Sequence, residues 1–189
     1  MFSSRSILTG LFALGFAADP AFAAPDIFYQ SDSPAEACAA GVAIPGEATP
    51  GLKRICEKAL DQPMISPHDK AATLANSGIV SLRLGAFEDA RARLEQARAL
   101  APDNGDISIS LAAALIRLER TDEAIALLSE TGSITPERLH LAYYNRALAH
   151  WARDEVEDAY RDFYTSAALK PGFAPAETAL AQFQVASAE

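Results

Sequence analysis

The chain has 189 residues, of which 25 are acidic and 16 basic, and its formal net charge is −9. Such an acidic protein is a poor ligand for a phosphate backbone, so the composition argues against a nucleic-acid partner. Behind the N-terminal segment no stretch is long and apolar enough to cross a bilayer, and we expect no membrane span in the mature chain.

The first 23 residues have the pattern of a cleaved export signal. Arg5 precedes an apolar stretch from Ile7 to Ala18, and Ala21-Phe22-Ala23 supplies the small-x-small pattern of a signal-peptidase site. The stretch is shorter than the roughly 20 residues of a transmembrane helix. We predict cleavage before Ala24 and export to a bacterial periplasm, with an uncleaved anchor as the alternative. Residues 24–32 are expected to form a flexible segment.

Residues 33–70 predict a helical N-terminal cap. Ser33 and Pro34 have the residue types of an N-cap and a first helical position, and Gly41 is expected to stop this helix. A second helix should begin at Thr49-Pro50 and end before Pro63. The apolar stripe of this helix can pack against the first helix that follows it and so cover the exposed end of the next segment.

The two cysteines, Cys38 and Cys56, fall one in each of these cap helices. An exported protein reaches an oxidising compartment, where disulfides form and persist, so a structural bridge between them is favoured. The alternative is two free buried thiols. The bridge would close a loop of about eighteen residues and contribute about 3 kcal/mol by the loop-entropy model.

Behind the cap, one pattern occurs three times. Alanine is followed four residues later by leucine or phenylalanine and twelve residues later by proline, at Ala90/Leu94/Pro102, Ala124/Leu128/Pro136 and Ala159/Phe163/Pro171. The alanines are 34 and 35 residues apart. A fixed period of this length indicates a stack of similar units, each fitting an antiparallel helix pair that buries too little to be stable alone.

These units resemble tetratricopeptide repeats (TPR), a family in which Leu74 and Gly78 would complete the first unit's pattern. The resemblance implies an all-α fold: a right-handed α-solenoid of three TPR helix pairs at 71–104, 105–138 and 139–173. The cap at 33–70 would precede them, and a C-terminal capping helix with its tail, 174–189, would follow. Two residues depart from the family's pattern: Glu119 stands where Gly85 can supply the turn between two helices, and Arg146 stands where an apolar residue is usual.

In the TPR family the first helix of each pair lines a concave groove that receives partner segments. By that resemblance the groove here would be mostly apolar, with the small residues Ala72, Ala75 and Ala113 and the larger residues Ile79, Leu82, Arg83, Ile109, Ile116, Arg117, Tyr144, Leu148 and Trp151. Tyr144 and Trp151 have the residue types of interface anchors. The alternative for Trp151 is packing against the C-terminal helix.

Polar groups along the same helices have two interpretations. Arg83 and Arg117 are one repeat apart and could hold a carboxylate together, or could be an ordinary solvated pair. Asn145 matches an asparagine common in TPR helices, where a structural hydrogen bond is expected. The acidic residues Asp154, Glu155, Glu157 and Asp158 suit a helix N-terminus, and a divalent-ion site is their alternative.

No catalytic motif is present: the sequence lacks HExxH, G-x-S-x-G and P-loop patterns. His140 and His150 are ten residues apart on one helix, which places them on different faces. We therefore expect no enzyme activity, no cofactor and no metal. The sequence favours a periplasmic scaffold that binds a protein or peptide partner, with cell-envelope assembly or integrity as its expected role. The alternative is a ligand- or peptide-binding accessory subunit of an envelope enzyme or transporter.

Overall fold

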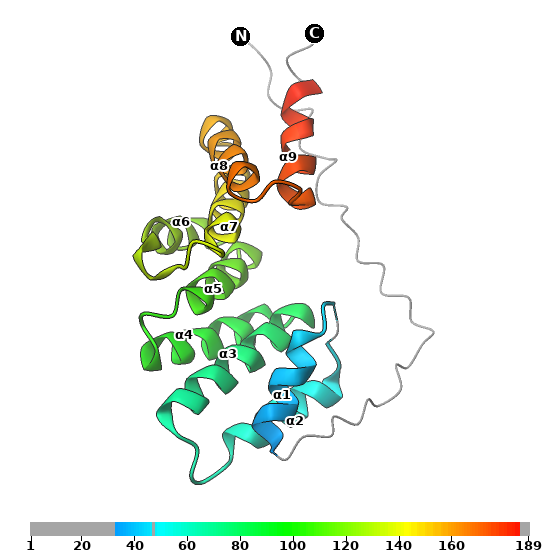
Figure 1. Cartoon of the computed structure of the whole chain (residues 1–189), viewed down its shortest axis with the longest axis vertical. Coiled ribbons are helices and arrows are strands. Elements are labelled where there is room, and N and C mark those ends of the chain that lie inside the picture. Colours follow the sequence, from blue (N-terminus) through cyan, green and yellow to red (C-terminus); the bar gives the residue numbers. More distant parts are fainter. Residues whose placement is uncertain (1–32, 47, 186–189) are drawn as a thin grey trace, which may run out of the picture.

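A computed structural model of the chain describes residues 33–46 and 48–185. The predicted signal peptide and the segment 24–32 lie outside the described residues. Within the described part the chain is all-α and contains no strand (Figure 1). Its elements are α1 Pro34–Ala43, α2 Pro50–Leu60, α3 Pro67–Arg83, α4 Phe87–Leu100, α5 Gly105–Arg117, α6 Thr121–Ser129, the 3-10 helix η1 Thr131–Ser133, α7 Leu139–Ala152, α8 Val156–Leu169 and α9 Ala174–Val185.

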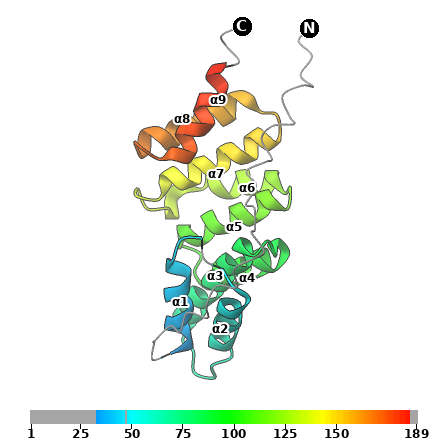
Figure 2. The same cartoon turned by 90° about the vertical axis from the view of Figure 1, so that its right-hand side faces the viewer.

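The helices form an α-solenoid, as the sequence predicted. Each helix packs against the next one in the chain, and α3, α5 and α7, the first helices of three successive pairs, also contact one another in order. Figure 2 shows the pairs stacked from α1 and α2 at one end to α8 and α9 at the other. None of the helices within the described ranges is long and apolar enough to cross a membrane.

The recurring residues form the interior of the stack. Ala90, Ala124 and Ala159 are fully buried, and the large residues four positions later are at most 2% exposed. Gly78 lies so close to Leu94 that a Cβ added to the glycine would be 2.6 Å from Leu94 Cγ. The repeated pattern is therefore the packing seam between the two helices of a pair.

The turn inside each pair uses a left-handed residue. Gly85 has φ 78°, and the corresponding residues of the next two pairs, Glu119 and Asp154, have φ 60° and 61°. Glycine adopts this conformation without steric cost, whereas another L-residue loses roughly 1–2 kcal/mol there. The structure thus keeps the turn where the sequence departs from glycine.

The second pair is irregular at its end. Helix α6 has 9 residues, whereas α4 and α8 have 14 each. After Ser129 the chain forms η1 around Gly132, and Ile134 then turns inward until it is 6% exposed. The backbone of Ser133 and Ile134 packs directly against Gly105 at the start of α5: a Cβ there would be 2.5 Å from the Ser133 carbonyl oxygen. A glycine at 105 thus permits the close approach of the two segments.

We expect Gly105→Ala to lower the free energy of unfolding by about 1–3 kcal/mol, because the added methyl group meets backbone atoms that must move. Gly132→Ala is the matched control, since nothing lies within 4 Å of the position that its Cβ would take. Urea denaturation followed by circular dichroism measures both. Equal stability of the two variants would show that the contact at Gly105 is not tightly packed.

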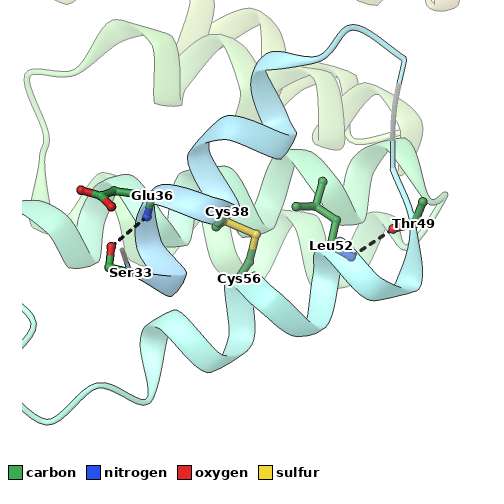
Figure 3. The surroundings of a disulfide bond; sticks show 6 residues. All are labelled: Ser33, Glu36, Cys38, Thr49, Leu52 and Cys56. Atoms are coloured by element: carbon green, nitrogen blue, oxygen red, sulfur yellow. Dashed lines mark hydrogen bonds between the residues drawn. A yellow bond between two sulfur atoms is a disulfide. The ribbon is translucent and has the colours of Figure 1, made fainter. Parts of the chain in front are cut away.

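The cap consists of α1 and α2, joined by a disulfide between Cys38 and Cys56 with an S–S distance of 2.05 Å (Figure 3). The side chains of Ser33 and Thr49 accept hydrogen bonds from the backbone N–H groups of Glu36 and Leu52 and so cap the two helices. The expectation that Gly41 ends α1 is wrong: the helix continues to Ala43. Gly41 is instead buried within it, where a small residue suits close packing.

The second cap helix follows the register of the repeats. Cys56 and Leu60 precede Ala90 and Leu94 by 34 residues each. Like Ala90, Cys56 is fully buried. Leu60 packs against the central core, which is the cluster of buried apolar residues that includes Ala90 and Leu94. The disulfide therefore occupies the seam that apolar contacts form in the later pairs.

Polar contacts attach the cap to the first pair. The Lys53 ammonium is 2.9 Å from an Asp89 carboxylate oxygen, and Ser81 Oγ donates to the same carboxylate at 2.6 Å. Burial acts to raise the pKa of Asp89, but the hydrogen bonds from Ser81 and Lys53 and the nearby charges lower it overall. A lowered carboxyl pKa means that this contribution to stability is present at neutral pH and is lost as the pH falls through the lowered value.

Candidate partner-binding surfaces

The predicted groove residues of the first two pairs divide into two groups. Ile79, Leu82 and Ile116 are partly buried, and Leu82 and Ile116 pack against the central core. Ile109, in contrast, is 6% exposed and belongs to the core itself. Because a fully buried side chain offers no surface to a partner, the contribution of Ile109 to this face is structural.

The aromatic residues of the third pair are engaged with the C-terminal part of the chain. Trp151 stacks edge-on against Phe183 of α9, with ring centroids 4.8 Å apart. Tyr144 contacts Phe163 and Phe173, the residue just before α9, at 5.6 and 5.4 Å. Burial raises the pKa of the Tyr144 hydroxyl. This geometry favours the alternative in which Trp151 packs against the C-terminal helix, and Leu148 lies in the same cluster.

The two arginines each have contacts of their own. The Arg83 guanidinium donates to the backbone oxygen of Ile44, 3.2 Å away at the end of α1, and so reaches the cap. The Arg117 guanidinium lies over the ring of Phe87, 4.5 Å from its centroid. Nothing in these contacts brings the two guanidinium groups together, and a joint carboxylate site stays a prediction.

Other polar groups singled out in the sequence have structural contacts. Asn145 Nδ2 donates to the backbone oxygen of Ile109 at 3.3 Å, which links α7 to α5. His140 is 4% exposed and lies edge-on to Phe173, while His150 Nδ1 is 2.6 Å from Glu155 Oε2. Within residues 33–46 and 48–185 no three potential metal ligands are grouped closely enough to hold an ion.

Sequence reasoning missed an exposed apolar surface on α8, here called the aromatic patch. It consists of Val156, Tyr160 and Tyr164, which are 50%, 43% and 60% exposed and follow one another at four-residue spacing, together with Phe183 of α9. The rings of Tyr160 and Tyr164 are stacked, and Tyr160 also meets Phe183 edge-on. Exposed apolar groups gathered on one face are typical of interaction sites.

A comparison between repeats would have found the aromatic patch. The corresponding residues are Phe87, Arg91 and Glu95 in the first pair and Thr121, Ile125 and Ser129 in the second. In the first pair Arg91 and Glu95 form an ion pair at 2.7 Å, which is typical of charged residues on a solvent-facing helix surface. Bulky apolar residues at all three positions are thus confined to the third of the three pairs.

Comparison with known proteins supports the architecture. A family model described as tetratricopeptide repeat matches residues 81–150. Seven chains of solved structures match, among them the MamA RS-1 ArsTM double mutant, with a TM-score of 0.60 and 19% sequence identity over 73% of this chain and 75% of that one. No curated protein matches the sequence. At this identity the structural match shows a shared fold and no shared partner.

Proposed function

We propose that this chain is a non-enzymatic scaffold that binds a segment of a partner protein on the face formed by α3, α5 and α7. The observation that carries the proposal is the row of partly exposed apolar side chains, Ile79, Leu82 and Ile116, along successive first helices of the stack. Partly exposed aliphatic groups on a rigid surface favour an apolar segment, because binding removes them from water without first ordering the scaffold.

We also propose that the protein acts in the periplasm, in cell-envelope assembly or integrity. The export pattern of residues 1–23 supports the location, and the Cys38–Cys56 disulfide is compatible with an oxidising compartment. The envelope role rests on analogy with other exported repeat proteins of this kind.

Partner capture from periplasmic extract tests the proposed face. Ala72 is exposed and Ala113 is partly exposed, so Ala72→Glu/Ala113→Glu places charge on this face without removing a large core side chain. We expect the double variant to recover at least about tenfold less of the crosslinked partner than wild type, since a buried unpaired carboxylate costs more than about 1.4 kcal/mol. Thermal unfolding of both proteins checks that the variant is folded.

The matched control is Tyr160→Ser/Tyr164→Ser in the aromatic patch. If recovery falls only in this control, the partner binds the outer face of α8 and the proposed face is wrong. Unchanged recovery with both double variants would contradict binding at either surface.

The second candidate function is a ligand-binding accessory subunit. It is favoured by one observation, a polar hollow of about 230 Å³ between the first and second helix pairs. None of the residues that line this hollow belongs to the proposed partner-binding face.

A further inference from the structure

The polar hollow lies where the end of the first pair meets the second. It is lined by the α4 residue Arg98, by Pro102 and Asp103 of the following turn, by Ser108 of α5 and by Leu127, Glu130, Gly132 and Ser133 around the end of α6. A volume of about 230 Å³ exceeds that of several water molecules, at about 30 Å³ each, and is suited to a ligand smaller than a typical drug.

Two departures of the second pair from its neighbours coincide at this hollow. Ser108 stands where the first pair has Leu74 and the third has Tyr143, so a large side chain is replaced by a hydroxymethyl group. Helix α6 also stops at Ser129, five residues short of the length of α4 and α8 (14 minus 9). Both changes remove material from the same place, and most of the residues that line it are exposed, so the result is a hollow that opens to the surface.

The lining has polar groups that the protein itself does not pair. Ser108 is 5% exposed, yet its hydroxyl has no hydrogen-bond partner among the described residues. Arg98, Asp103 and Glu130 likewise form no ion pair within that part of the chain. The Ser108 side chain lines the hollow, so its hydroxyl group is open to whatever fills that space and can donate to a ligand or accept from it.

We propose that this hollow binds a free α-amino acid with a cationic side chain, such as lysine, ornithine or arginine. The guanidinium of Arg98 matches the ligand carboxylate, and the carboxylates of Asp103 and Glu130 match its two positive groups. The three charged side chains sum to −1, which complements the net charge of +1 on these amino acids at neutral pH. The Ser108 hydroxyl completes the site from its floor.

This inference deepens the second candidate function and is independent of the partner-binding face. Isothermal titration of the full mature chain with L-lysine tests it, and cadaverine, which is lysine without its carboxylate, is the control ligand. We expect lysine to bind at least about tenfold more tightly than cadaverine, because a charge-assisted hydrogen bond to Arg98 is worth that much or more. L-Glutamate, with the opposite charge, should bind more weakly than lysine.

Two variants make the outcome decisive. Arg98→Gln should abolish the preference for lysine over cadaverine, because it removes the partner of the ligand carboxylate together with a positive charge that repels the diamine. Ser108→Leu restores the residue type of the first pair, and it should abolish lysine binding while raising the melting temperature. Absence of any lysine signal in wild type at about 10 mM ligand, enough to detect a Kd of about 1 mM, would overturn the proposal. Lysine binding that survives both variants would place the ligand elsewhere. Neither result bears on partner capture by the face of α3, α5 and α7.

Discussion

Asp162→Ala should lower the free energy of unfolding by about 3 kcal/mol, because it leaves a largely buried guanidinium without its counterion. Asp162 lies on α8 with a side chain 6% exposed, and its two oxygens accept from Arg146 Nε and Nη2 at 2.6 and 2.8 Å. Arg146 on α7 is 21% exposed and also lies over the Tyr143 ring. Urea denaturation at neutral pH measures the loss.

The second helix pair supplies the control for this prediction. At the positions of Arg146 and Asp162 it has Leu111 and Leu127, one repeat of 35 residues earlier. A buried ion pair can often be exchanged for apolar residues at little or no cost, whereas losing one partner is expensive. Arg146→Leu/Asp162→Leu is therefore expected to recover most of the stability that Asp162→Ala loses. If the single and double variants were equally unstable, the pair's packing and not its charge would hold the two helices together.

The architecture could be predicted because its determinants recur. Ala90 and Leu94 have counterparts in each pair, and a residue that must be small or bulky in every unit leaves a periodic trace. The sequence showed that Arg146 departs from the apolar pattern, but it did not show which residue pairs with it, because this pair does not recur. Its partner Asp162 is 16 residues away on another helix, and a single compensating pair has no period to reveal it.

The surfaces were harder to predict than the fold. Trp151 has the residue type of an interface anchor, but its surroundings depend on where α9 packs. In the structure the ring of Phe183 on α9 lies against Trp151 in an edge-to-face contact. The aromatic patch and the polar hollow were detectable in principle, since Tyr164 and Ser108 differ from the residues one repeat away. A difference between repeats indicates a binding surface only when the residue is known to be exposed, and its exposure depends on tertiary packing.

The stability of the cap should depend on the disulfide more strongly than the stability of the other helices does. Its buried cluster is small, consisting of Cys38, Leu52, Cys56 and Val80, and two of these four residues are the bridged cysteines. Cross-linking two residues that are 18 positions apart restricts the unfolded chain by about 3 kcal/mol in the loop-entropy model. We expect Cys38→Ala/Cys56→Ala to lose about that much stability, with alanine chosen because a serine hydroxyl would be buried without a partner.

The loss should be local, since α3 and the later helices keep their own apolar seam. Hydrogen exchange measured by mass spectrometry is expected to show faster exchange in α1 and α2, a smaller change in α3 where Val80 loses its cover, and none in α7 and α8. Wild type treated with reductant should reproduce the pattern of the double variant, and the variant should not respond to reductant. Uniformly faster exchange in every helix would instead mean that the stack unfolds as one unit and that the cap is required for all of it, as an end-sealing element of a solenoid can be.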